Sequence, residues 1–133
     1  MELTGKCKEE FEKWINFYGK HHVEDRFNKL LDWGTLTDSM QYGVYVDYFD
    51  SVGIYIQLTP YFDSVKEVVL WFFTLENKRC VHLNSHLENK ANTRPEVRTK
   101  AIEKANEIRN KQFENEQQHK LSKGELQQNN KQL

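Results

Sequence analysis

The sequence lacks the features that define several classes of protein. Its 133 residues include only two cysteines and two prolines, and its six glycines occur singly. Two cysteines are too few for a disulfide scaffold, and isolated glycines form neither a phosphate-binding loop nor a dinucleotide-binding motif. No apolar run approaches the roughly 18 residues of a membrane span, and the first residues contain no signal-peptide core. We therefore expect a cytoplasmic protein with reduced thiols, no cofactor and no membrane partner.

Charge of one sign is also scarce, because the formal net charge is only −1. A chain this close to neutral is not a dedicated polyanion binder. The total nevertheless hides an asymmetry. Residues 37–67 hold one lysine against five acidic residues, and residues 88–112 hold seven basic residues against four acidic ones. These two segments either neighbour each other in the fold or mark surfaces of opposite charge.

The apolar residues are concentrated before residue 114, which predicts a single domain over residues 1–113. Residues 114–133 form a polar tail rich in glutamine and asparagine. Such a segment buries too little apolar surface to offset the entropy lost on ordering. We expect it to be disordered or a frayed helix, and its glutamine content leaves a helical extension open.

Helical periodicity marks the first third of the chain. The apolar residues of the first segment recur on one face of a helix that begins after Thr4 as N-cap and ends near Tyr18. That face comprises Cys7, Phe11, Trp14, Ile15 and Tyr18. A shorter helix is predicted over residues 24–33. Residues 37–53 are ambiguous between strand and helix, and we favour a helix because Thr37 suits its start and Gly53 its end.

Three runs rich in β-branched and aromatic residues predict an antiparallel sheet. They are Ile54–Phe62, Val65–Leu75 and Arg79–Ser85. The uninterrupted apolar run at residues 68–73 predicts a central strand covered on both faces. Pro60 places the first strand at an edge of the sheet or near its own end.

The clearest local signal opens the last helix. Thr93 and Glu96 form a capping box, with Pro95 in the first turn. The apolar stripe of this helix includes two alanines, which allow close packing against a sheet. The predicted fold class is therefore α+β: N-terminal helices, a three-stranded antiparallel sheet and a C-terminal helix packed on one sheet face.

Candidate catalytic and metal-binding residues are few. Cys80, His82 and His86 match no familiar zinc spacing, and His21 and His22 could join them only through the fold. Asp47 and Asp50 could divide acid and base roles only in contrasting environments. Cys7 lies on an apolar helix face, which is typical of an inert core thiol. A metal-dependent hydrolase is therefore a distant alternative, and we predict no enzymatic activity and no bound metal.

Protein binding is the favoured function, and the segment from Tyr42 to Tyr55 is the favoured surface. It combines acidic and aromatic side chains, and its tyrosines outnumber those that a small core holds. The residues predicted to contact a partner protein are Tyr42, Tyr45, Asp47, Tyr48, Asp50 and Tyr55.

Nucleic-acid binding through the last helix is the alternative function. Its candidate residues are Arg94, Arg98, Lys100 and Lys104. The predicted order of helices and strands resembles that of double-stranded RNA-binding domains, which contact phosphates across grooves. Glutamates interrupt the helix at every turn, however, and nucleic-acid binders normally concentrate their basic residues.

Three blocks of the sequence resemble small uncharacterised proteins encoded by bacteriophages and prophages. The blocks are LTGKCKEEFEKW, MQYGVYVDYFDSVGIYI and TRPEVRTKAIEKANEIRNKQF, and residues 59–92 match least well. The resemblance implies a phage origin, a bacterial host cytoplasm and an accessory role such as host takeover or anti-defence. It implies no catalytic residues.

Overall fold

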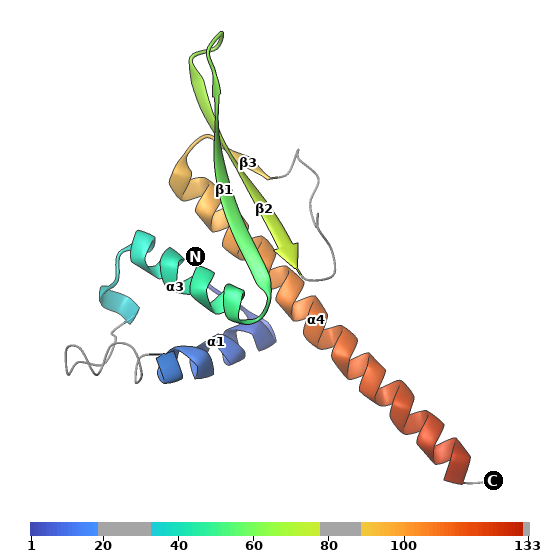
Figure 1. Ribbon diagram of the computed structural model, residues 1–133. Helices are drawn as coiled ribbons and strands as arrows, with labels where there is room; N and C mark the ends of the chain where they lie inside the picture. The colour runs from blue at the N-terminus through green and yellow to red at the C-terminus, as the bar shows by residue number, and fades with distance from the viewer. Residues whose placement is uncertain (19–32, 78–88, 132–133) are drawn as a thin grey trace.

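The computed structural model describes residues 1–18, 33–77 and 89–131. In these ranges the chain forms three α-helices, one short 3₁₀ helix and three strands (Figure 1). Their order is α1 (Gly5–Tyr18), η2 (Trp33–Thr35), α3 (Asp38–Ser51), β1 (Ile54–Asp63), β2 (Val68–Asn77), β3 (Lys90–Ala91) and α4 (Arg94–Lys131). The sheet is antiparallel with strand order β1-β2-β3. The α+β class with a three-stranded antiparallel sheet and a C-terminal helix against it is confirmed.

Two predicted elements fall on residues that the structure leaves undescribed. The predicted helix over residues 24–33 lies outside the described ranges except for Trp33, which begins η2. The predicted strand Arg79–Ser85 lies outside them entirely. The third strand of the described sheet is Lys90–Ala91, which pairs with β2 at Trp71 and Phe72.

The ambiguous segment before the sheet is helical. Thr37 is the N-cap of α3, and its side chain accepts a hydrogen bond from the Met40 backbone N–H. Gly53 follows the helix with a φ of +81°, a left-handed conformation that glycine adopts without a steric penalty. The favoured helical interpretation is therefore confirmed, and the strand alternative for these residues is wrong.

The turn between β1 and β2 moves the start of the second strand. The Asp63 carboxylate accepts hydrogen bonds from the backbone N–H groups of Val65 and Lys66, at 3.0 and 3.3 Å. This local bonding favours a turn over a continuing strand, so residues 64–67 form the turn and β2 begins at Val68. The predicted start at Val65 is therefore wrong. Pro60 lies in β1, an edge strand among the described residues, as expected.

Among the described residues, helices cover one face of the sheet only, which corrects the prediction that the central strand is buried on both faces. In β2, Phe73 and Leu75 are 3% and 1% exposed and pack in one core with residues of α4. Val69, further along the same face, is 41% exposed. The hairpin of β1 and β2 extends beyond the helices (Figure 1), so its distal half has no second layer.

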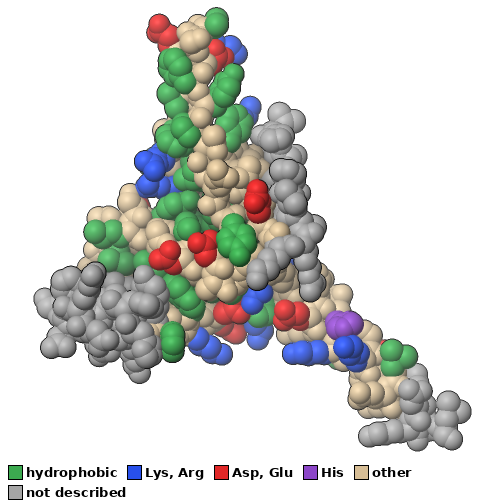
Figure 2. Space-filling model, in the orientation of Figure 1, with side chains coloured by type: hydrophobic (Ala, Val, Ile, Leu, Met, Phe, Trp, Pro, Cys, Tyr) green, Lys and Arg blue, Asp and Glu red, His purple; other side chains and the backbone are tan. Residues whose placement is uncertain are grey.

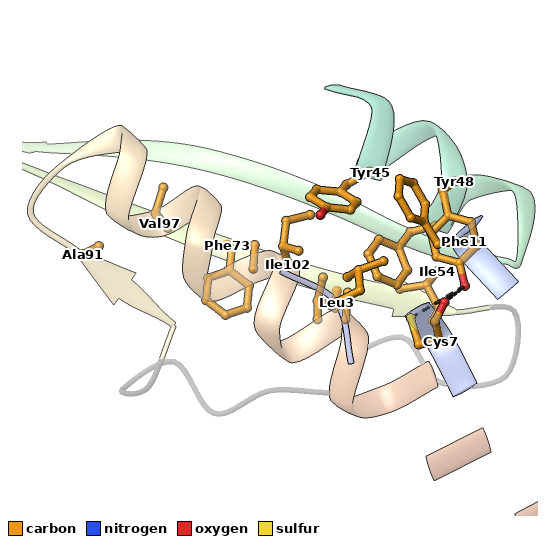
Figure 3. Close-up of a cluster of buried hydrophobic side chains, with 14 residues drawn as sticks. Leu3, Cys7, Phe11, Tyr45, Tyr48, Ile54, Phe73, Ala91, Val97 and Ile102 are labelled. Atoms are coloured by element: carbon orange, nitrogen blue, oxygen red, sulfur yellow. Dashed lines mark hydrogen bonds between the residues drawn. The ribbon is translucent and has the colours of Figure 1, made fainter. Parts of the chain in front are cut away.

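The core runs along α4 and ends between the three helices (Figure 3). The predicted apolar stripe of α4 is in place, since Val97, Ala101 and Ala105 are fully buried. The Glu96 backbone N–H donates to Thr93 Oγ1 at 3.3 Å, so Thr93 caps the start of α4. α4 continues as an exposed helix to Lys131. The structure thus has the helical extension that the sequence left open, and the expectation of a disordered or frayed tail does not describe residues 114–131.

Two asparagines of α4 hold the first turn of α1. The Asn106 side chain accepts from the Thr4 backbone N–H and donates to Thr4 Oγ1, both at 2.9 Å. The Asn110 side chain accepts from the Cys7 backbone N–H at 2.9 Å and donates to the Thr4 carbonyl at 3.0 Å. Thr4 is thus the N-cap that the sequence predicted, but α4 supplies the side-chain bonds. Gly5 lies between the two asparagines with a φ of +63°.

A Gly5→Ala substitution should therefore destabilise the protein strongly. Its Cβ would lie 2.9 Å from Asn110 Oδ1, in a backbone conformation that alanine rarely adopts. We expect a loss of at least about 2 kcal/mol in the free energy of unfolding, measured by urea denaturation. Gly43→Ala is the matched control, because no atom lies within 4 Å of the added Cβ. It should leave stability unchanged or raise it by up to about 1 kcal/mol, and equal losses in both variants would contradict the argument.

Candidate functional site

A buried chain of polar groups joins α1, α3 and α4. The Tyr48 hydroxyl donates to Glu10 Oε1 at 2.8 Å and lies 3.6 Å from Cys7 Sγ (Figure 3). Either the thiol or the hydroxyl can be the donor in the contact between Cys7 and Tyr48. Glu10 in turn receives two bonds from Arg109, at 2.9 and 2.7 Å. The Arg109 guanidinium is also 4.3 Å from the centre of the Phe113 ring.

The ionisation of these groups suits a structural role. Burial raises the pKa of the Cys7 thiol to about 11, although the hydrogen bond with Tyr48 opposes the change. Burial, and then the hydrogen bonds and charges of Cys7 and Glu10, raises the pKa of Tyr48 well above its ordinary value. Neither group is available as a nucleophile or a base near neutral pH. The network joins three helices and satisfies their buried polar groups.

Cys7 should accordingly resist thiol reagents in the folded protein. In a Cys80→Ser background, where Cys7 is the single cysteine, a disulfide reagent at about pH 8 should react only slowly, because the thiolate is scarce and enclosed. Absorbance of the released chromophore reports the reaction. The same sample unfolded in guanidinium serves as the control and should react fully. Rapid labelling of the folded protein would show that Cys7 is accessible.

Glu10 should make stability depend on pH. Burial alone would raise its pKa, but the hydrogen bonds from Arg109 and Tyr48, together with the Arg109 charge, lower it overall. A carboxyl group whose pKa is lowered by folding stabilises the folded state above its ordinary pKa. That contribution is lost as the pH falls through the folded pKa.

Glu10→Gln should therefore cost on the order of 1–2 kcal/mol of unfolding free energy at neutral pH, and the difference from the unsubstituted protein should shrink at about pH 3. Urea denaturation at both pH values measures it. Glu12→Gln makes the same chemical change on an exposed position of α1 and should cost little at either pH. A Glu10→Gln difference that is independent of pH would contradict the assignment.

The structure divides the tyrosine-rich segment that the sequence selected for protein binding. Tyr45 and Tyr48 are 3% and 0% exposed, so neither can contact a partner on the surface, and this part of the prediction is wrong. The helical period of α3 turns both residues toward α1, where their rings lie 5.0 and 5.3 Å from the ring of Phe11. Tyr42 is half-buried, with the Arg98 guanidinium 5.1 Å from its ring centre.

Three residues of that segment remain on the surface. Asp47 and Asp50 are exposed on α3, and Tyr55, at the start of β1, is 42% exposed. Partial burial and the neighbouring charge of Asp47 raise the pKa of Asp50. Figure 2 shows acidic side chains in the region of α3 and the start of β1, and apolar side chains along the hairpin.

The four basic residues of the nucleic-acid alternative do not form one continuous strip. The Arg94 guanidinium lies 5.4 Å from the centre of the Trp71 ring, and Arg98 donates to Ser39 Oγ at 2.8 Å. The ammonium of Lys100 donates to the Lys90 carbonyl, whereas that of Lys104 pairs with Glu107. Only Arg94 and Arg98 are brought together, at the first two turns of α4 beside the hairpin.

Metal binding finds no support in the described part of the chain. It contains no group of three or more histidine, cysteine, aspartate or glutamate residues able to hold a metal ion. The candidate residues Cys80, His21, His22, His82 and His86 lie outside the described ranges. A depression of about 620 Å³ lies between α4, the end of β2 and the residues that join α3 to β1. Arg109, which lines it, is already bonded to Glu10.

Three large exposed apolar residues lie on the distal hairpin, which the sequence reasoning did not select. Tyr61, Phe62 and Val65 are 56%, 62% and 92% exposed. The exposed position of these residues could have been inferred by comparing the length of the strands with the length of the buried stripe on α4. Ten-residue strands extend over roughly 33 Å, whereas the buried stripe Val97–Ala105 of α4 covers roughly 12 Å of helix. Half of an apolar hairpin therefore had to remain uncovered.

Comparisons with protein-family models, with curated protein sequences and with solved structures find no match to this chain. None of the helices in residues 1–18, 33–77 and 89–131 is long and apolar enough to cross a membrane. The function must therefore be argued from the surface itself.

Proposed function

We propose that the protein acts by binding another protein through the outer face of the β1–β2 hairpin. We define the outer face as Tyr55, Tyr61, Leu70 and Phe72. In β2, Phe73 and Leu75 point toward α4, and successive side chains of a strand point to opposite faces. Leu70 and Phe72 therefore point away from the helices. Tyr61 is paired with Leu70 in the register of the hairpin and lies edge-on to Phe72, with ring centres 6.3 Å apart.

The contact between the ring of Tyr61, which is 56% exposed, and the half-buried ring of Phe72 is the observation that carries the proposal. Contiguous exposed apolar patches on soluble proteins commonly mark interaction sites. Tyrosine suits such a site because its ring buries a large area while its hydroxyl keeps a hydrogen bond. The rings are also held in place by a paired hairpin, so binding costs little side-chain entropy.

Acidic side chains border one end of this face and indicate the chemistry of the partner. Glu76 lies opposite Tyr55 in the register of the hairpin and is exposed. Asp47 and Asp50 belong to the helix that leads into β1. An aromatic centre with an acidic rim favours a partner surface with an apolar centre and a basic rim. This role retains Tyr55, Asp47 and Asp50 from the sequence prediction and moves the centre of the surface to the hairpin.

We further propose that the protein is a non-enzymatic, phage-type accessory protein whose partner is a protein of the bacterial host. The blocks that resemble phage proteins fall on α1, on α3 with the start of β1, and on α4, which together supply most of the buried core residues. Residues 59–92, where the resemblance is weakest, include the distal hairpin. A shared framework with a variable exposed surface is expected when related proteins bind different partners.

A Tyr61→Ser substitution tests the proposed surface. Affinity capture from a bacterial host lysate, quantified by mass spectrometry, should enrich one partner with the unsubstituted protein. Loss of a central aromatic residue typically costs at least about 2 kcal/mol of binding, so its capture by the variant should fall more than about tenfold.

Leu121→Ser is the matched control, because Leu121 is 68% exposed on the distal part of α4 and the change again removes an exposed apolar side chain. It should capture the partner as well as the unsubstituted protein. Equal capture by the Tyr61→Ser variant, with an unchanged circular dichroism spectrum, would remove the outer face from the proposal.

A further inference from the structure

We propose that the opposite face of the distal hairpin binds a second copy of this chain, so that two hairpins pack antiparallel and face to face in a two-fold dimer. We define this inner face as Pro60, Phe62, Val69 and Trp71. It is separate from the outer face, and the inference does not depend on the proposed binding function.

The inner face is apolar and open to solvent. Phe62 is paired with Val69, and Pro60 with Trp71, in the register of the hairpin. These residues continue the row of Phe73 and Leu75, so the face that is buried against α4 near the base extends outward into solvent. Phe62 and Val69 are 62% and 41% exposed, and burying such side chains yields roughly 25 cal/mol per Å².

The two ends of this face carry opposite charge. At the tip, residues 63–67 contain Asp63 and Glu67 against Lys66. At the base, Arg94 projects from the first turn of α4 to within 5.4 Å of the centre of the Trp71 ring, and Arg98 follows one turn later. The apolar strip is therefore acidic at its outer end and basic at its inner end.

This arrangement selects a second copy as the occupant. A two-fold interface uses the same patch on both subunits, so the patch must complement itself. An apolar strip with opposite charges at its ends complements itself when the strips of two copies run antiparallel. The acidic tip of each hairpin then lies beside Arg94 of the other copy, while Phe62 and Val69 meet across the centre.

Face-to-face packing also fits the free edge of β1 better than strand addition does. The Phe73 backbone N–H donates to the carbonyl of Asn89, the residue before β3, so Phe73 directs its backbone groups away from β1. In an antiparallel pair the bonded positions alternate. The backbone N–H and C=O groups that point to the edge of β1 left unpaired in the described sheet are consequently those of Leu58, Pro60 and Phe62. Pro60 has no N–H, so it interrupts this row of donors.

Sedimentation velocity over a range of protein concentrations tests the dimer. The unsubstituted protein should shift from monomer to dimer below about 1 mM, the range of weak specific association. Phe62→Ser should raise the dissociation constant by about tenfold or more. Tyr61→Ser, the neighbouring change on the outer face, should leave it unchanged. A monomer at all concentrations, or equal effects of the two substitutions, would overturn the proposal.

Charge reversal tests the antiparallel arrangement. Glu67→Arg places two basic ends at each contact of its own dimer, and Arg94→Glu places two acidic ends there, so each variant alone should dimerise several-fold more weakly. A mixture of the two should form the heterodimer, because both of its contacts again join opposite charges. The Glu67→Arg/Arg94→Glu double variant should recover the homodimer for the same reason. A mixture no more associated than its components would exclude this geometry.

The two proposals fail separately. Phe62→Ser should still capture the host partner, and Tyr61→Ser should still form the dimer. Loss of capture in the Phe62→Ser variant would show that the inner face serves the other partner and would overturn its assignment to a second copy.

Discussion

The attachment of the first turn of α1 to Asn106 and Asn110 of α4 is the interaction on which the rest of the structure depends. The first N–H groups of a helix have no partner within the helix. Here two of the N–H groups at that end, those of Thr4 and Cys7, are bonded by side chains from the far end of the sequence. Residues four apart lie on the same face of a helix, so the two asparagines fix both the position and the direction of α1. This direction brings Glu10 to Arg109, and the Tyr48 hydroxyl of α3 then joins Glu10 to Cys7.

The same arrangement explains why the hairpin is exposed. α1, α3 and the middle of α4 gather around the end of the sheet where β1 begins, and their side chains fill the core there (Figure 3). Within the described ranges, the first turns of α4 alone remain to cover the rest of the sheet, and two of their buried residues are alanines. Alanine permits close approach but covers little area. The packed core at the start of β1 and the uncovered distal half of the hairpin therefore have the same cause. Exposed apolar side chains on the hairpin lower solubility, a cost that binding would offset.

Features set by neighbouring residues could be predicted from the sequence, and features set by distant ones could not. The N-cap bond of Thr93, the N-cap Thr37 and the left-handed Gly53 are local, and the structure has all three. The burial of Tyr45 and Tyr48 depends on which face of α3 meets α1, and α4 decides this through its asparagines. The roles of Asn106 and Asn110 could not be predicted, because an asparagine in a polar helix is normally expected to be exposed to solvent. The turn at Asp63 was local, but its side-chain bonding competed with a long apolar run and was overlooked.

The candidate surfaces follow from the period of a strand. Tyr61 and Phe62 are neighbours in β1, and the pleat directs them to opposite faces of a two-stranded arm. The distal half of the hairpin, which no described helix covers, thus presents two different surfaces. Alternate residues of each strand form one surface, and the residues between them form the other. On the outer face the aromatic rings end beside the acidic residues of α3 and β2, whereas on the inner face the row ends beside the arginines of α4. The two faces therefore differ at the end of the hairpin nearest the helices, where Glu76 lies beside the outer row and Arg94 contacts Trp71 of the inner row, and this difference separates the two proposed surfaces.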